Sequence, residues 1–100
     1  MIYTIEKTTI FEKWIKGIKN PKDKARIFAR IKRAELGNLG DHKQLAENLF
    51  EMRIFLGPGF RLYYTVRDEK IIFLLCGGNK SSQAKDIRKA KTILEELEWE

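Results

Sequence analysis

The sequence is poor in the residues from which many metal and catalytic sites are built. It contains one cysteine, Cys76, and one histidine, His42. A single cysteine cannot form an internal disulfide, and because Cys76 lies in an apolar run we expect a buried, reduced thiol. A single histidine excludes a ribonuclease mechanism that uses two histidines, and it excludes a histidine-based metal centre. We therefore expect no metal and no cofactor, and we expect His42 to be an ordinary surface residue.

Long hydrophobic runs are also missing. The longest, residues 71–76, has the length of a strand, whereas a membrane-spanning helix needs roughly 20 apolar residues. The first residues, Met1 to Thr4, lack the charged and then apolar order of a signal peptide. These features predict a cytoplasmic protein. One hundred residues, of which 43% are hydrophobic and 34% charged, predict one globular domain that spans residues 1–100.

The charge of the chain is strongly positive. Twenty Lys and Arg side chains face fourteen Asp and Glu, which gives a formal net charge of +6. Four of the acids lie in the last six residues, so the preceding 94 residues carry 20 basic and 10 acidic side chains, a difference of +10. A basic body of this size attracts phosphate polymers, although lysines that merely solvate the surface would give the same composition.

The helices are indicated by capping residues and by apolar residues at helical spacing. Thr9 followed by Glu12 has the form of a capping box, and it predicts the start of a first helix. Asn20 and Pro21 are favoured at the cap and the first position of a second helix, which Gly37 should end. We expect these two helices to form an antiparallel hairpin, followed by a polar connection over residues 37–48.

The strands are indicated by a change of period from 3.6 to two. Gly57-Pro58-Gly59 predicts a turn between two alternating segments, and Gly77-Gly78 should end the last strand. Ser81 or Ser82 should cap a final helix, whose apolar face holds Ala84, Ile87, Ala90, Leu94 and Leu97. The predicted class is α+β, in the order β-α-α-β-β-β-α, with the helices packed on the apolar face of an antiparallel sheet. The expected strands are residues 2–6, 50–56, 61–67 and 71–76.

The parity of the hairpin around Pro58 predicts which side chains share a face. A turn centred there pairs residues whose numbers sum to about 116, so odd positions lie opposite odd positions. The expected pairs are Phe55 with Arg61, Arg53 with Tyr63, and Glu51 with Thr65. The predicted polar face holds Arg53, Arg61, Tyr63 and Arg67. Arginine binds phosphate and tyrosine can stack on a base, which suits RNA, but a solvated surface with Glu51 paired to Arg53 is an alternative.

Gly77-Gly78-Asn79-Lys80 precedes the final helix in the manner of a phosphate-binding loop. It lacks the glycine and lysine spacing that such loops require, so we do not expect nucleotide binding there.

Three groups of motifs, in this order, resemble the HigB-like toxins of type II toxin–antitoxin systems, also called addiction modules. These toxins belong to the RelE/ParE superfamily, and the resemblance extends from about residue 9 to residue 93. The motifs are Phe11-Glu12-Lys13-Trp14 with Ala25-Arg26-Ile27, Arg30-Ile31 and residues 37–43; Glu51-Met52-Arg53-Ile54 with residues 57–64; and residues 74–80 with Gln83, Asp86-Ile87 and Ala90.

The resemblance implies both a fold and an activity. It implies the RelE/ParE fold and a ribosome-dependent endoribonuclease that cleaves mRNA in the decoding site. The implied reaction is attack of a ribose 2′-hydroxyl on the adjacent phosphate, which leaves a 2′,3′-cyclic phosphate. The implied partners are the ribosome, mRNA and a cognate antitoxin, often a DNA-binding protein of the helix-turn-helix type.

The resemblance also assigns roles to particular residues. It implies that Arg53 and Arg61 stabilise the phosphorane, and that Lys80 binds phosphate or acts as an acid. It further implies that Gln83 holds the Lys80 loop, although a hydrogen bond at the helix N-terminus is the alternative role. The implied catalytic residues are Arg53, Arg61 and Lys80, and the implied RNA- or ribosome-binding residues are Lys43, Tyr63 and Gln83, to which the predicted polar face adds Arg67. Tyr63 would stack on a base or take part in proton transfer.

The C-terminus departs from the pattern of the wider superfamily. Some members carry a catalytic tyrosine or histidine there, whereas this chain ends in Glu98-Trp99-Glu100. The general base is therefore unassigned, and we expect the acidic tail to point away from the ribosome. Two alternative functions stay open: a ParE-like inhibitor of DNA gyrase, and a non-catalytic binding module with the toxin fold.

Overall fold

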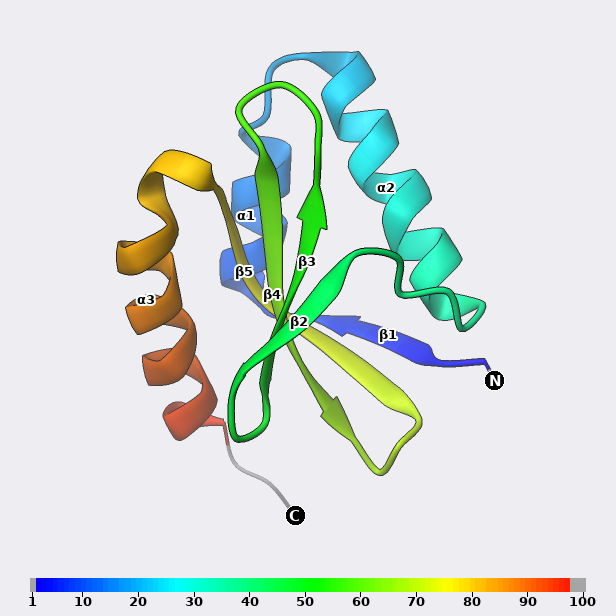
Figure 1. Cartoon of the computed structure of the whole chain (residues 1–100), viewed down its shortest axis with the longest axis vertical. Helices are drawn as coiled ribbons and strands as arrows, with labels where there is room; N and C mark the ends of the chain where they lie inside the picture. Colours follow the sequence, from blue (N-terminus) through cyan, green and yellow to red (C-terminus); the bar gives the residue numbers. More distant parts are fainter. Residues whose placement is uncertain (1, 98–100) are drawn as a thin grey trace.

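The computed structural model describes residues 2–97 of the chain. Within these residues the chain forms five strands and three α-helices, so the predicted α+β class is confirmed (Figure 1). The order differs from the prediction because the polar connection over residues 37–48 contains an additional strand. The elements are β1 (Thr4–Lys7), α1 (Thr9–Lys16), α2 (Pro21–Glu35), β2 (His42–Ala46), β3 (Leu49–Ile54), β4 (Phe60–Arg67), β5 (Ile71–Asn79), the 3-10 turn η1 (Lys80–Ser82) and α3 (Gln83–Glu96).

The five strands form a single sheet in the order β1-β5-β4-β3-β2. β1 runs parallel to β5, and the other neighbours are antiparallel. The additional strand, β2, is an edge strand with a register shift between Gln44 and Ala46. Its first three residues are exposed and polar, so it shows no alternation of polar and apolar residues that would have predicted it.

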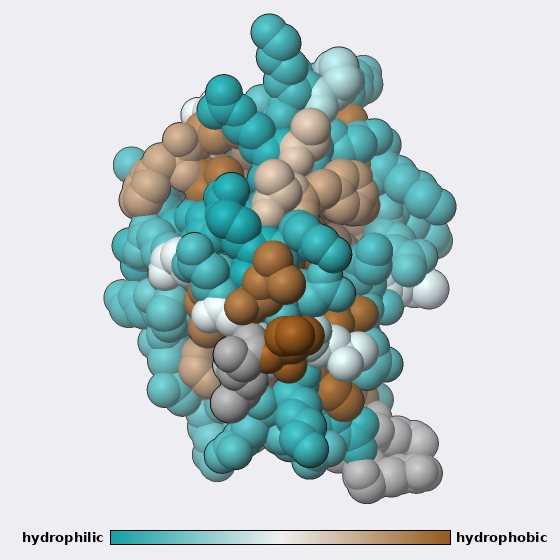
Figure 2. All heavy atoms as spheres, turned by 90° about the vertical axis from the view of Figure 1, so that its right-hand side faces the viewer, coloured by the Kyte–Doolittle hydropathy of each residue, from teal (hydrophilic) through white to brown (hydrophobic). Residues whose placement is uncertain are grey.

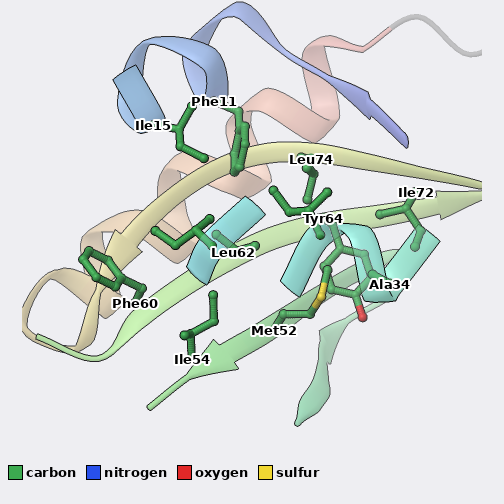
Figure 3. Packing of buried hydrophobic residues seen from close by; sticks show 12 residues of the cluster. Phe11, Ile15, Ala34, Met52, Ile54, Phe60, Leu62, Tyr64, Ile72 and Leu74 are labelled. Carbon is green, nitrogen blue, oxygen red and sulfur yellow. The ribbon is translucent and has the colours of Figure 1, made fainter. Parts of the chain in front are cut away.

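The helices cover both faces of the sheet, which corrects the prediction that they share one. α1 and α2 cover a cluster that includes Phe11, Leu62 and Leu74 (Figure 3). α3 covers the other face, where Ala90 and Ile93 pack on a second cluster. This second cluster holds Leu49, Tyr63, Leu75 and Cys76. Tyr63 pairs with Cys76 and Tyr64 pairs with Leu74, so Leu75 is an extra residue in β5. Because of this β-bulge, the consecutive side chains of Leu75 and Cys76 both join the cluster under α3.

Each of the two N-terminal helices begins at a residue whose side chain caps it. Thr8, and not Thr9, caps α1: its hydroxyl accepts a hydrogen bond from the Phe11 amide at 3.0 Å and donates one to the Leu75 carbonyl at 2.6 Å. The second bond, to β5, is a tertiary contact that a local capping motif cannot reveal. The predicted cap at Asn20 is confirmed. The predicted hairpin is not matched exactly, because α1 rests chiefly on β5 whereas α2 lies against β1.

The β3–β4 hairpin has the predicted parity but a register shifted by two residues. Arg53 lies opposite Arg61, and Glu51 lies opposite Tyr63. β3 ends at Ile54, so Phe55 belongs to the connection and pairs with nothing in β4. A shift of two residues exchanges the partners and leaves each side chain on its predicted face.

The last strand continues through the glycines that were expected to end it. β5 extends to Asn79, and at Gly77 and Gly78 a side chain would overlap with the ring of Trp14 and the carboxylate of Asp86. Asn79 caps the turn η1, and Ser82, although it precedes α3, makes no side-chain capping bond. Ala84 is exposed, which corrects its place on the apolar face of α3. In sequence alone, glycines that admit a neighbouring side chain within a strand resemble the glycines of a turn.

The buried state expected for Cys76 is confirmed, and His42 is exposed. Across residues 2–97, no helix has the length and apolarity needed to span a membrane. The end of the acidic tail, residues 98–100, lies outside the described residues, and so does the expectation about its direction.

Candidate functional site

Two arginines from neighbouring strands share one buried carboxylate. Arg53 of β3 and Arg61 of β4 are directly opposite in register, with side chains 30% and 12% exposed. The carboxylate of Glu51, which is fully buried, contacts Arg61 Nη1 at 3.0 Å and Arg53 Nη2 at 3.5 Å. Like charges on opposite positions of a sheet repel, so the Glu51 carboxylate stabilises a pair that would otherwise be unfavourable.

The same carboxylate connects the sheet to α3. Gln83, the first residue of α3, donates from its side-chain amide to Glu51 Oε1 at 3.4 Å. Gln83 thus bonds to β3, and its implied role of holding the Lys80 loop stays a prediction. Lys43 of the edge strand β2 lies opposite Glu51 in register, and it is exposed. The face therefore carries positive side chains around one central negative charge.

A third cation approaches the arginines from the turn before α3. Lys80 lines, together with Arg53 and Arg61, a depression of about 100 Å³, which we call the cation hollow. The turn is held by the side chain of Asn79, which accepts hydrogen bonds from the amides of Ser81 and Ser82 at 3.0 and 3.2 Å. The amide of Lys80 also donates to the carbonyl of Pro58 at 3.3 Å. The position of Lys80 is thus fixed from both sides, while its side chain remains exposed.

Comparison with known proteins places the chain in a family. Residues 13–98 match the model of the family described as phage derived protein Gp49-like (DUF891). The chain belongs to this Gp49-like family. A protein of Haemophilus influenzae (strain Rd), described as uncharacterized, is 44% identical over 97 residues, which cover 97% of this chain and 98% of the relative.

A solved structure shares the fold of this Gp49-like chain. A chain of the toxin–antitoxin complex RelBE2 from Mycobacterium tuberculosis superimposes with a TM-score of 0.65 and 21% sequence identity. The match covers 80% of the Gp49-like chain and 100% of that chain. At this level of identity the comparison shows the common fold.

Arg67 and Tyr63, both predicted site residues, do not line the cation hollow. Arg67 is six residues beyond Arg61, roughly 20 Å along β4, and lines a different hollow near the end of α3. Tyr63 is fully buried under α3. Burial, with a smaller contribution from Glu51, raises the pKa of the Tyr63 phenol far above its usual value. The ring is therefore not placed to stack on a base, and the hydroxyl is buried away from solvent.

The structure of the Gp49-like chain adds a residue that sequence reasoning missed as a positioning group. Arg30 of α2 is 7% exposed and donates hydrogen bonds to the carbonyls of Leu39 at 2.9 Å, Asp41 at 2.8 Å and Arg53 at 2.8 Å. Burial, followed by the charge of Arg33, lowers the pKa of Arg30. Arg30 lies between Ile27 and Ile31 on the apolar face of α2, and this position in the sequence could have indicated that its side chain is buried. Arg30 fixes the backbone of Arg53 and so supports the cation hollow from behind.

Proposed function

We propose that this Gp49-like chain is the toxin of a toxin–antitoxin pair, and that it is a ribosome-dependent endoribonuclease that cleaves translated mRNA. The Gp49-like family is a family of toxins from toxin–antitoxin systems, which supports the first part of the proposal. The shared fold with a chain of the RelBE2 toxin–antitoxin complex agrees with it. The RelE/HigB-like subtype rests on the resemblance of the sequence motifs, and the nuclease activity rests on the cation hollow.

One observation carries the nuclease proposal. Arg53, Arg61 and Lys80 come from three different segments and line a single depression on the surface. Glu51 offsets one of their three positive charges, so the group retains a net charge of +2. A phosphodiester carries one negative charge and gains a second on its way to the phosphorane. A preorganised, partly buried cluster of cations therefore stabilises the transition state more than the substrate.

The proposed reaction is an internal transfer at phosphorus. The 2′-oxygen of the ribose forms a bond to phosphorus while the bond from phosphorus to the 5′-oxygen of the next nucleotide breaks. The proton of the 2′-hydroxyl passes to solvent water, and Lys80 donates a proton to the departing 5′-oxygen. Arg53 and Arg61 bind the non-bridging oxygens, and Glu51 holds both guanidinium groups in place as a positioning residue.

The proposal includes partners. A cognate antitoxin neutralises the toxin, and the ribosome presents the mRNA in its decoding site. A basic chain that binds the ribosome through phosphates loses affinity steeply as salt is added. A shallow salt dependence would instead favour a binding module whose contacts are mainly apolar.

The experiment compares the intact chain with two variants after induction in bacteria. We expect growth arrest and new cuts in translated messages from the unchanged chain. Arg61→Ala should lower the cleavage rate by about 100- to 1,000-fold, the usual cost of losing one charge-stabilising donor. Lys80→Ala should also lower it, and because Lys80 is exposed this variant keeps its fold. Arg88→Ala, which removes an exposed arginine of α3, is the matched control.

The other outcomes distinguish the alternatives. Growth arrest with intact messages would overturn the nuclease proposal and favour a gyrase inhibitor, which a DNA-damage assay would reveal. No arrest from the unchanged chain would favour the non-catalytic module. Cleavage that is equal in the Lys80→Ala and Arg88→Ala variants would remove Lys80 from the mechanism.

A further inference from the structure

Phe55 is the most exposed large hydrophobic residue described in the chain. Its side chain is 81% exposed and lies directly after β3, in the connection to β4. Single exposed apolar residues are common on protein surfaces, so exposure alone assigns no role. What distinguishes Phe55 is its position, because it lines the cation hollow together with Arg53 and Lys80.

Phe55 also lines a second depression, of which Arg53 is likewise a lining residue. This depression, which we call the α2 groove, has a volume of about 420 Å³ and is bounded by α2 and the end of β3. The face of the molecule that carries α2 is largely hydrophilic (Figure 2). Arg53 and Phe55 are common to the α2 groove and the cation hollow, so the two depressions adjoin at these residues.

The α2 groove contains two further arginines that remain exposed. Arg26 and Arg33 follow the spacing that places them on one side of α2, with Arg30 between them. Arg30 uses its guanidinium on three backbone carbonyls, whereas Arg26 and Arg33 present theirs to solvent. Asp41 is the acidic residue among the described residues that line this groove. The groove therefore keeps a positive balance next to an exposed aromatic ring.

We infer that the RNA strand runs from the cation hollow across Phe55 into the α2 groove. Phe55 stacks on the base beside the cleaved phosphate, and Arg26 and Arg33 bind phosphates of the nucleotides that follow. An aromatic ring flanked by cations is the arrangement by which proteins bind single-stranded nucleic acids. The inference rests on the proposed binding of RNA at the cation hollow, and it gives Phe55 the stacking role that buried Tyr63 cannot perform.

The test separates the aromatic contribution from the ionic one. Binding of a short fluorescent single-stranded RNA is measured over a range of salt concentrations, and cleavage is measured on ribosomes programmed with mRNA. Phe55→Ala should weaken binding by about 5- to 150-fold with an unchanged salt slope, because stacking is not ionic. Phe55→Trp should restore binding. Phe28→Ala removes another exposed phenylalanine, on α2, and serves as the control.

The arginines have a different expected signature. The double variant Arg26→Gln, Arg33→Gln should lower the magnitude of the salt slope by about 1.4, which corresponds to two phosphate contacts on a single strand. The double variant Arg88→Gln, Lys91→Gln removes the same charge from exposed positions of α3 and should leave the slope unchanged.

The outcomes distinguish this inference from the proposed function. If the unchanged chain cleaves mRNA and both sets of variants behave like their controls, the path is wrong and the function stands. If the unchanged chain binds RNA in the expected manner but does not cleave, the path stands and the nuclease proposal is wrong. Failure of the unchanged chain to bind the free RNA overturns the path, whereas the proposed function stands or falls with cleavage on ribosomes. Variants that bind RNA normally but escape the co-expressed antitoxin would show a protein-docking surface and overturn the path.

Discussion

At the scale of single residues, the Glu51 carboxylate allows two arginines to lie side by side in the candidate site. A carboxylate with no solvent exposure is costly unless it is paired, and Glu51 is paired with two arginines and an amide. The alternation of β3 and β4 predicted that Arg53 and Arg61 share a face. It could not predict that Glu51 is buried between them, because burial on that face depends on α3, which packs from a distant part of the chain.

A double-mutant cycle measures this pairing. We expect Glu51→Gln to lower the free energy of unfolding by about 3 kcal/mol, because it leaves partly buried guanidinium groups without their counter-charge. Arg61→Gln should cost a similar amount, and the double variant should cost less than the sum by about 1 to 3 kcal/mol. Urea unfolding followed by circular dichroism gives all four values. Additive effects would show that the two side chains do not interact, and Glu12→Gln, at an exposed position, is a control.

At the scale of elements, β5 shows how glycines can serve packing within a strand. Gly77 and Gly78 are consecutive, so their α-carbons face opposite sides of the sheet, toward Trp14 of α1 and Asp86 of α3. The ring of Trp14 is confined by Phe11 and Phe60, at ring-centroid distances of 5.5 and 6.2 Å. The two glycines thus allow helices to approach closely on both faces at the same point along β5.

Alanine at two glycine positions should have opposite effects. A Cβ at Gly77 would overlap with the confined ring of Trp14, so Gly77→Ala should lower the free energy of unfolding by about 1 to 3 kcal/mol. Gly17, at the end of α1, has φ of −77° and no Cβ contact shorter than 3.4 Å among the described residues. Gly17→Ala should therefore raise stability by about 0.5 kcal/mol. Equal thermal midpoints for the two variants would contradict this account of β5.

At the scale of the whole molecule, the two core clusters bury three groups that can lose a proton. Burial raises the pKa of the Cys76 thiol from 9.0 to about 12, and Asp86 contributes to this shift. Burial also raises the pKa of Tyr64 from 10.0 to about 12, and the pKa of Tyr63 shifts in the same direction. The folded chain therefore holds these protons to a higher pH than the unfolded chain does.

This difference predicts that stability falls in alkaline solution. As the pH rises, the Cys76 thiol loses its proton in the unfolded chain before it does so in the folded chain. The contribution of Cys76 to the free energy of unfolding is therefore complete below about pH 9 and is lost as the pH rises toward 12. Each such group adds a slope of up to about 1.4 kcal/mol per pH unit. Urea unfolding between about pH 8 and about pH 11 should show a smaller slope for Cys76→Ala than for the unchanged chain. Equal slopes would show that the thiol does not titrate in this way.

The sequence by itself determined the class of fold, the second helix start and the parity of the hairpin. These follow from local rules: the cap at Asn20, the period of apolar residues, and the alternation that places Arg53 and Arg61 together. The same alternation, with the motif that includes Lys80, identified the cations that line the hollow.

Only the tertiary structure decided what each face of the sheet meets. The packing of α3 buries Tyr63 and Glu51, the bulge between β4 and β5 adds a second consecutive side chain of β5 to the cluster under α3, and the two-residue shift of the hairpin leaves Phe55 outside β3. None of these can be read from spacing, because each depends on contacts between segments far apart in the chain. The pattern along a strand assigns a side chain to a face, and the element that packs on that face decides whether the side chain reaches solvent.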